Sequence, residues 1–298
     1  MSTTCSRLVV VSRQGQGETV LQHAALVTAA LSPDVVRVVH LMPGGSSAAD
    51  EDATREHHVA LLSQDLRAMH GDGRLTLVLG HGNALEVVLA EVQANQADLL
   101  LIGSHRAGVG RRALERRLAM TAPCSVWVAP ETAAVSLARI LVPVDFSQRS
   151  ADALGVATSL AAAAGSLSTH ALHVRFDPSR AASDDRELIV VGREREAFAT
   201  FSARVDLHDV DVEFLCEQGH DVARTILHVA STLEANLVVM GTRGRTRAAS
   251  LLIGSETEHA LLWSDVPVLA VKHFGARLRF LEALADARLR QRDNPQFT

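Results

Sequence analysis

Short apolar runs of strand length alternate with segments of helical spacing along the whole chain. In the first half they follow one another at residues 8–11, 18–31, 35–41, 53–69, 74–79, 84–93, 99–102, 111–120 and 125–128. Strands that are apolar throughout are typical of parallel sheets covered by helices, and strict alternation requires right-handed crossover connections. The pattern therefore predicts an α/β fold in which a parallel sheet has helices on both faces.

The second half of the chain repeats this pattern after about 135 residues, a period that indicates domain duplication rather than a solenoid. The repeat matches residues 7–11 with 139–143, 35–41 with the run that ends at His173 and Val174, 97–103 with 235–241, and Pro123 with Pro267. We therefore predict two domains, at 1–132 and 138–274, each with a five-stranded sheet. Residues 131–138 are the expected linker, and leucines at helical spacing predict a C-terminal helical extension over 275–298.

One set of glycines carries the most specific chemical information. Gly241, Gly244, Gly254 and Ser255 begin where the apolar run 237–240 ends, and Ser255 opens a helical pattern. Backbone N–H groups of a Gly-rich turn and of a helix N-terminus form an anion site at the carboxyl edge of a parallel sheet. Glycine also permits positive φ and a close approach of the backbone to a phosphate. The gap between Gly244 and Gly254 is too long for a Walker A loop, so we interpret it as a flap over a nucleotide, with an ordinary strand-to-helix loop as the alternative.

Four motifs in their order resemble the universal stress protein family, in its ATP-binding branch. They are the strand and turn 140–147, the strand segment 171–174, the glycine set and the apolar run 266–271, and together they cover residues 139–272. The resemblance implies two tandem Rossmann-like domains (adenine nucleotide alpha hydrolase-like), with strand order 3-2-1-4-5 in each. It also implies that the second domain binds ATP, with or without Mg²⁺.

The resemblance assigns the nucleotide site residue by residue. Asp145 stands where the family's Asp contacts the nucleoside end of ATP, although a turn or helix-cap role is the structural alternative, with Ser147 as a competing N-cap. Glu256 departs from the family, in which this position is small or apolar, so its carboxylate either repels the phosphates or helps to hold Mg²⁺. The residues assigned to ATP are Pro143, Val144, Asp145, Val174, Met240, Gly241, Arg243, Gly244, Gly254, Ser255, Glu256 and Thr257.

The first half departs from the family at the same positions. Arg13, or Ser12 in a shifted register, stands where Asp145 stands in the second half. The segment from Ile102 to Pro123 is six residues shorter than its counterpart in the second half. Because the contracted loop would not span a triphosphate, we expect the first domain to be degenerate for ATP.

Composition narrows the class of protein. Only 3% of the 298 residues are aromatic, so the cores must be aliphatic, and a net charge of −5 argues against a general nucleic-acid or membrane-surface binder. Three cysteines are too few for a disulfide framework. Neither a signal-peptide pattern nor an apolar run of membrane-spanning length is found in the sequence, and we expect a cytoplasmic location.

Other polar groups have structural interpretations. The pairs His57–His58 and His170–His173 have no third ligand at suggestive spacing, so surface or core roles are favoured over metal binding. Cys216 is expected to be a small buried hydrophobe within a strand. Asp177, Asp184, Asp185 and Glu187 are expected to lie in a solvated loop.

No nucleophile elbow, paired catalytic carboxylates or Ser/Cys–His arrangement is present in the sequence. The favoured interpretation is therefore a stress-response regulator or sensor in which ATP orders the loop from Gly244 to Gly254. The alternatives are a scaffold that binds no nucleotide and a slow ATP hydrolase. We also expect the two apolar fifth strands to pair, which would make an internal pseudo-dimer and remove two exposed sheet edges; a homodimer of whole chains is a further expectation, and the sequence names no protein partner.

Overall fold

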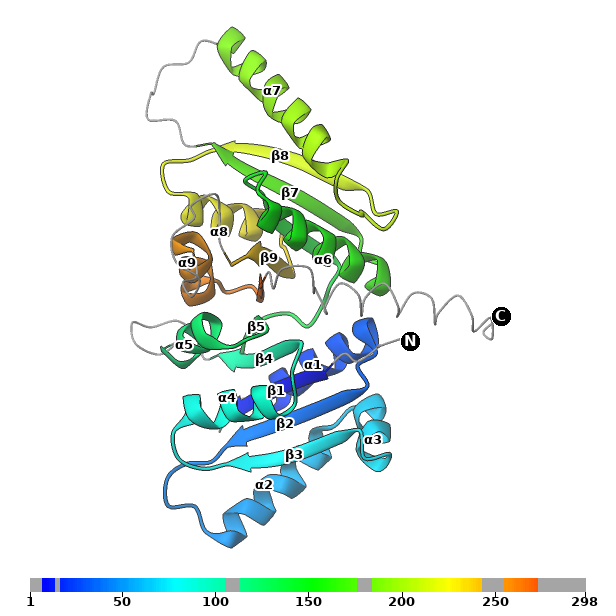
Figure 1. The fold of residues 1–298 in the computed structure, drawn as a ribbon, viewed down its shortest axis with the longest axis vertical. Coiled ribbons are helices and arrows are strands. Elements are labelled where there is room, and N and C mark those ends of the chain that lie inside the picture. The colour runs from blue at the N-terminus through cyan, green and yellow to red at the C-terminus, as the bar shows by residue number, and fades with distance from the viewer. Residues whose placement is uncertain (1–6, 14–16, 105–112, 176–183, 243–253, 273–298) are drawn as a thin grey trace, which may run out of the picture. The chain divides into compact units, whose positions relative to one another are not determined.

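The computed structural model describes residues 7–13, 17–104, 113–175, 184–242 and 254–272. The chain divides into two compact units between Val135 and Ser136, and each unit is described by itself (Figure 1). The predicted C-terminal helical extension lies outside the described residues. The predicted pairing of the two fifth strands depends on how the two units are placed. Both stay predictions.

The first unit contains a parallel sheet in the strand order β3-β2-β1-β4-β5. Helix α1 contacts both α2 and α3, and α4 contacts α5; right-handed crossovers place the two groups on opposite faces of the sheet. The strands are β1 (Arg7–Arg13), β2 (Val35–Leu41), β3 (Leu75–Gly80), β4 (Leu99–Ser104) and β5 (Ser125–Pro130). The helices are α1 (Gly17–Leu31), α2 (Ala48–Leu61), α3 (Gln64–Gly71), α4 (Ala84–Ala94) and α5 (Ala113–Thr121).

The second unit repeats this topology with the order β8-β7-β6-β9-β10, again in parallel. Helices α8 and α9 contact each other, whereas α6 and α7 belong to the connections on the opposite face. The strands are β6 (Arg139–Pro143), β7 (Ser168–Arg175), β8 (Val212–Gln218), β9 (Leu237–Gly241) and β10 (Val268–Val271). The helices are α6 (Gln148–Ala164), α7 (Asp184–Ser202), α8 (Val222–Thr232) and α9 (Ser255–Trp263). The predicted fold class and the strand order 3-2-1-4-5 are both confirmed.

The single helix predicted over residues 53–69 is wrong, because two helices, α2 and α3, lie there. Ser47 and Asp50 form a capping box that starts α2 before the predicted boundary. Ser63 then caps α3 by accepting a hydrogen bond from the Leu66 amide at 3.3 Å. A hydrophobic pattern that continues through Leu62 hides this break, and the serine is the only local signal for it.

Two further expectations are corrected. Asp184, Asp185 and Glu187 lie in α7 rather than in a loop, since a run of charges does not distinguish a solvated helix from a solvated loop; Asp177 lies outside the described residues. Cys216 is half-buried rather than buried, although desolvation still raises the pKa of its thiol.

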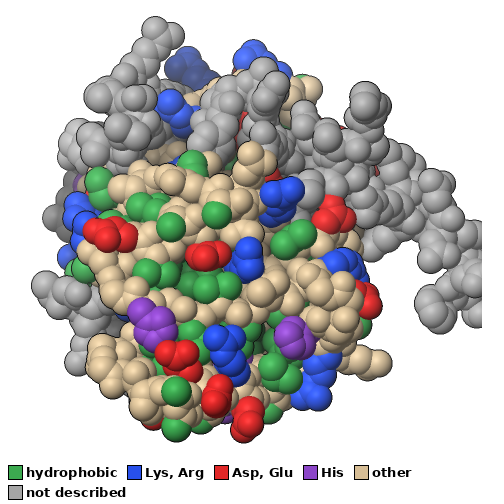
Figure 2. Space-filling view, turned by 60° about the horizontal axis from the view of Figure 1, so that its bottom comes forward, with side chains coloured by type: hydrophobic (Ala, Val, Ile, Leu, Met, Phe, Trp, Pro, Cys, Tyr) green, Lys and Arg blue, Asp and Glu red, His purple; other side chains and the backbone are tan. Residues whose placement is uncertain are grey.

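The cores are aliphatic, as composition predicts, with Trp127 as the largest fully buried side chain. On the face shown in Figure 2, acidic and basic side chains are interspersed, so this face carries no basic stripe of the kind that follows a nucleic-acid backbone. Among the described helices, none has the length and apolar character needed to cross a lipid bilayer.

Candidate functional site

A cavity of about 350 Å³ in the second unit lies where β6, β7 and β9 end and α8 and α9 begin. This is the carboxyl edge of the sheet, at the point where the strand order reverses, which is the usual ligand position in open α/β sheets. Arg243 and Gly244 lie outside the described residues. The other ten residues assigned to ATP all line this cavity: Pro143, Val144, Asp145, Val174, Met240, Gly241, Gly254, Ser255, Glu256 and Thr257.

The turn after β6 positions Asp145. The Val144 amide still pairs with the Leu172 carbonyl at 2.8 Å, so the sheet holds the chain up to the residue before the carboxylate. The Asp145 carboxylate accepts a hydrogen bond from the Ser147 amide at 3.1 Å, and Ser147 caps α6 by accepting from the Ser150 amide at 3.3 Å. Asp145 thus has the turn role, and Ser147 the helix-cap role, that the sequence offered as the structural alternative. The Asp145 carboxylate nevertheless lines the cavity.

His173 is a lining residue that the sequence assignment missed. Its Nδ1 lies 2.8 Å from the Val144 carbonyl oxygen, and because a carbonyl can only accept, Nδ1 carries the proton. The imidazole stacks on Phe146, with ring centroids 4.6 Å apart. His173 therefore ties β7 to the residue that precedes Asp145.

The rest of the lining is apolar or small, and the sequence assignment missed it too. These residues are Ser150, Leu172, Val222 and Ile226. Val222 and Ile226 are four residues apart on α8, so the apolar stripe of that helix was the available signal.

Gly241 and Gly254 differ in the structural reason for having no side chain. At Gly241 a Cβ would lie 2.8 Å from the Arg149 carbonyl oxygen, so packing of α6 against β9 already excludes a side chain there. Gly254 has φ of −67°, an ordinary value, so positive φ is not the reason for a glycine at this position. As the N-cap of α9, Gly254 makes no side-chain capping bond.

The N-terminus of α9 supplies the polar end of the cavity. Within a helix the amides of Ser255, Glu256 and Thr257 have no intrahelical acceptor, and the helix dipole favours an anion beside them. Thr257 is buried and its hydroxyl donates to the Gly241 carbonyl at 2.8 Å, so the hydroxyl proton is already used. The Ser255 hydroxyl donates to the Glu256 carboxylate at 3.2 Å.

Comparison with known proteins identifies the fold and the family. A family model described as the universal stress protein family matches residues 7–130 and again 137–272. The chain belongs to the universal stress protein family. No curated protein matches the chain at a significant level.

Solved structures support the tandem fold of this universal stress protein. A protein described as a universal stress protein from Pseudomonas aeruginosa UCBPP-PA14 is 21% identical, with a TM-score of 0.66 over 95% of this chain and 98% of its own. A universal stress protein from Archaeoglobus fulgidus DSM 4304 is 16% identical, with a TM-score of 0.61 over 89% of this chain and 98% of its own. A universal stress protein in complex with cAMP covers 46% of this chain and 97% of its own, at 23% identity and a TM-score of 0.36; the ligand is a property of that protein.

Strand registers define which residues correspond in the two units of this universal stress protein. Arg7 pairs with Val35 in the first unit, and Arg139 pairs with Ser168 in the second. Counting along these strands, Arg13 corresponds to Asp145 and His40 to His173. The register therefore selects Arg13, not Ser12, as the counterpart of Asp145.

The same registers correct the length of the contracted loop. Leu99 pairs with Ser125, and the corresponding Leu237 lies beside Pro267, whose carbonyl accepts from the Val238 amide. Ser125, rather than Pro123, is therefore the counterpart of Pro267. Ile102 and Ser125 are 23 positions apart, and Met240 and Pro267 are 27 apart, so the first-unit segment is four residues shorter, not six.

In the first unit an ion pair takes the place of the residues that line the second unit's cavity. Helices α5 and α9 each end four residues before Ser125 and Pro267, so Glu115 corresponds to Thr257. Arg13 forms a close ion pair with Glu115, whose side chain is fully buried. Arg13 Nε and Glu115 Oε2 are also buried and have no hydrogen-bond partner among the described residues.

Proposed function

We propose that the second unit binds ATP in the cavity at the carboxyl edge of its sheet, and that the protein is a cytoplasmic stress-response regulator or sensor linked to this nucleotide. The observation that carries the proposal is the convergence of ten assigned residues, from four separate stretches of the chain, on one cavity. The resemblance to the family, which uses no spatial information, assigns all ten to the nucleotide.

The cavity has chemically distinct ends. Val144, Val174, Ile226 and Met240 provide apolar walls, which suit the faces of an adenine ring, and Asp145 provides an acceptor for ribose hydroxyls. At the other end the first-turn amides of α9 suit phosphate oxygens. The residues present therefore fit a purine nucleotide whose base lies toward β7 and whose phosphates lie toward α9.

Because of Glu256, binding of a nucleotide with several phosphates should depend on a cation. Asp145 and Glu256 are the charged side chains among the described residues that line the cavity, and a carboxylate beside a polyphosphate is repelled unless a positive charge intervenes. Mg²⁺ takes carboxylate and phosphate oxygens as ligands. Glu256 and the phosphates would share the ion, so Mg²⁺ should strengthen binding of ATP.

Regulation would follow from linkage between binding and conformation. A ligand that binds only the folded state of the second unit stabilises that state, and a ligand that prefers one conformer shifts the population toward it. No residue of the described cavity is assigned a catalytic role, and hydrolysis is not required for such a sensor.

The test is calorimetric titration of the full chain with ATP, with and without Mg²⁺, after mass spectrometry of any nucleotide released from the purified protein. Saturable binding that Asp145→Ala weakens supports the proposal. Asp152→Ala on the neighbouring α6 is the control, since this residue does not line the cavity. Absence of binding under both conditions would leave a scaffold without nucleotide as the function.

A further inference from the structure

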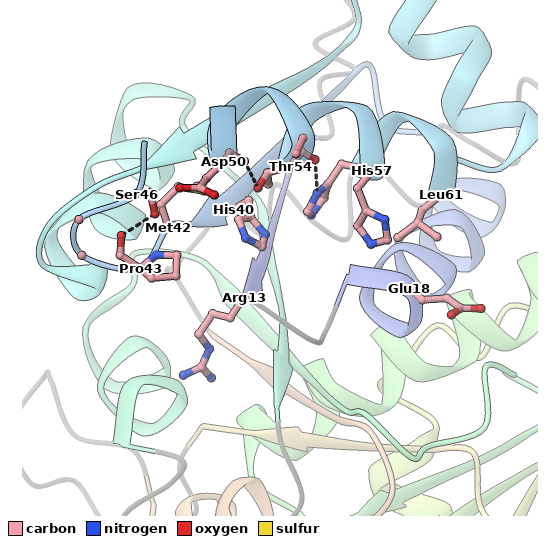
Figure 3. Close-up of a pocket in the computed structure, with 14 residues that line it drawn as sticks. Arg13, Glu18, His40, Met42, Pro43, Ser46, Asp50, Thr54, His57 and Leu61 are labelled. Carbon is pink, nitrogen blue, oxygen red and sulfur yellow. Dashed lines mark hydrogen bonds between the residues drawn. The ribbon is translucent and has the colours of Figure 1, made fainter. Parts of the chain in front are cut away.

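The first unit contains a larger cavity, of about 770 Å³, on the face of its sheet that α2 covers (Figure 3). It lies between the end of β1, the end of β2 and one side of α2. The cavity of the second unit lies against α8 and α9 instead, which correspond to α4 and α5. The two cavities therefore adjoin the same strand ends, because Arg13 and His40 correspond to Asp145 and His173, but they extend toward different helices.

In the second unit the corresponding space is filled by aromatic rings. His173, the counterpart of His40, stacks on Phe146, and Phe146 in turn contacts Phe201 with ring centroids 5.6 Å apart. None of the eight phenylalanines of the chain precedes Phe146. The first unit therefore has no phenylalanine with which to fill the cavity beside His40.

A chain of hydrogen bonds fixes the tautomers of two buried histidines beside this cavity. His58 Nδ1 lies 3.0 Å from the Thr54 carbonyl oxygen, which can only accept, so Nδ1 carries the proton and Nε2 is an acceptor. The Ser12 hydroxyl lies 3.0 Å from His58 Nε2 and must donate to it. Ser12 Oγ then accepts from His40 Nδ1, at 2.9 Å.

His40 consequently presents an unprotonated Nε2. The side chain is only 6% exposed, it lines the cavity, and its Nε2 has no hydrogen-bond partner among the described residues. Burial, reinforced by the neighbouring His58 and His57, lowers the pKa of His40 to about 4. At neutral pH this nitrogen is an unprotonated acceptor on a residue that lines the cavity, and a bound ligand could donate to it.

The other polar groups of the cavity favour a cation. Asp50 and Glu18 lie at opposite ends of the space, with His40 and His57 between them (Figure 3). Hydrogen bonds from the Ser47 amide and hydroxyl lower the pKa of Asp50, so its carboxylate is ionised at neutral pH. The positive charge of Arg13, which also lines the cavity, is already neutralised by Glu115.

The cavity is also elongated. Its α2 wall consists of positions spaced three and four residues apart from Asp50 to Leu61, which is one face of a helix. At 1.5 Å per residue this wall is roughly 16 Å long. An extended ligand with separated charges fits this shape better than a compact one.

We propose that this cavity binds a linear di- or polyamine. One ammonium group lies near Asp50, another lies near Glu18, and an amine N–H between them donates to His40 Nε2. The proposal does not depend on ATP binding by the second unit, and the two can fail separately.

The experiment is calorimetric titration of the full chain with spermidine, with putrescine and uncharged triethylene glycol as comparison probes. We expect one spermidine site per chain, weaker binding of putrescine, and none of triethylene glycol. Glu18→Gln should weaken spermidine binding about three- to tenfold, because one of two charge contacts is lost. The control is Glu56→Gln, an exposed carboxylate of α2 outside the cavity, which should leave the affinity unchanged.

A second pair of variants tests location without disturbing the buried histidines. Ala53 is exposed and lines the cavity, whereas Ala60 is exposed on the same helix and does not. Ala53→Phe should abolish spermidine binding with an unchanged thermal midpoint, and Ala60→Phe should not. Equal effects of the paired variants, or no saturable binding of spermidine at low millimolar concentration, would overturn the proposal. ATP titrations of the same variants separate this result from the function of the second unit.

Discussion

Arg13 and Glu115 form an ion pair at the two positions that Asp145 and Thr257 hold in the second unit. In the second unit Thr257 donates to a backbone carbonyl and leaves the Asp145 carboxylate beside an open cavity. In the first unit the longer Glu115 side chain meets a guanidinium instead, so β1 and α5 are joined by opposite charges. In the first unit, two of the positions assigned to ATP in the second unit are thus held by an ion pair that joins a strand to a helix.

Breaking this ion pair should destabilise the first unit. Arg13→Met leaves the fully buried Glu115 carboxylate without its counter-ion, which costs about 3 kcal/mol in comparable buried pairs. The double variant Arg13→Met/Glu115→Leu should recover most of the loss, because no unpaired charge remains. Urea unfolding of the three proteins measures this, and a double variant no more stable than Arg13→Met would contradict the assignment.

ATP should bind once per chain. The assigned residues line a cavity in the second unit, whereas the corresponding positions of the first unit hold the pair Arg13–Glu115. Calorimetry of the full chain with Mg²⁺ and ATP should give a stoichiometry near one, and Arg13→Met should leave it unchanged. A stoichiometry near two, or binding that survives loss of the second site, would show that the first unit is not degenerate.

The fold was predictable because its signals are local and repeated. The apolar strands and the helical spacing occur twice in the same order. A segment whose type is ambiguous in one half can therefore be assigned as helix or strand from its counterpart in the other half. The break between α2 and α3 was missed because a single serine, Ser63, decides it while the apolar pattern runs on. The error of two residues in matching Pro123 to Pro267 arose because proline can precede a strand at more than one position, and only the pairing of Leu99 with Ser125 fixes the register.

The site was predictable only as far as a motif marks it. The residues near the glycines and after β6 were found, but His173 was given only a surface or core role, because its bond to the Val144 carbonyl depends on the register between β6 and β7. The ion pair Arg13–Glu115 joins residues 102 positions apart, and no local pattern predicts it. The lining of the cavity beside His40 comes from β1, β2 and α2 together, so no local pattern predicts it either.

Gly254→Val should abolish ATP binding while the fold stays intact. Since φ at Gly254 is ordinary, valine is tolerated by the backbone, and the expected loss arises because its side chain stands beside the α9 amides that would contact phosphate. Gly244→Val is expected to act in the same way, from the sequence alone. Gly241→Val is a poor probe, because a Cβ there meets the Arg149 backbone and would disturb packing.

A glycine outside the cavity provides the control for Gly254→Val. Gly192 lies within α7 with no atom near the position of an added Cβ. Gly192→Ala should therefore leave ATP affinity unchanged and stabilise the second unit by up to about 1 kcal/mol, from the higher helix propensity of alanine. If Gly254→Val binds ATP like the unmodified protein, α9 does not hold the phosphates.

The first unit should lose stability as the pH falls from neutrality toward 4. Burial lowers the pKa values of His23 and His40 to about 4, whereas an unfolded histidine titrates near 6.5. Between these values the unfolded state binds more protons than the folded state, so the free energy of unfolding rises with pH through this window. The stability is fully present above about pH 6.5 and is lost progressively toward pH 4, by an amount on the order of 3 kcal/mol for each histidine.

His23→Leu should separate this effect from general acid denaturation. Both ring nitrogens of His23 are buried and have no hydrogen-bond partner among the described residues, so the imidazole is desolvated without compensation. An apolar side chain of similar size should stabilise the first unit by about 1 kcal/mol at pH 7 and by more at pH 5, where the histidine must also resist protonation. Urea unfolding at the two pH values gives the comparison. The exposed His81 provides the control, because His81→Leu removes an imidazole that is not buried and should not flatten the pH dependence. Equal slopes for His23→Leu and the unmodified protein would show that His23 is protonated, or otherwise satisfied, in the folded state.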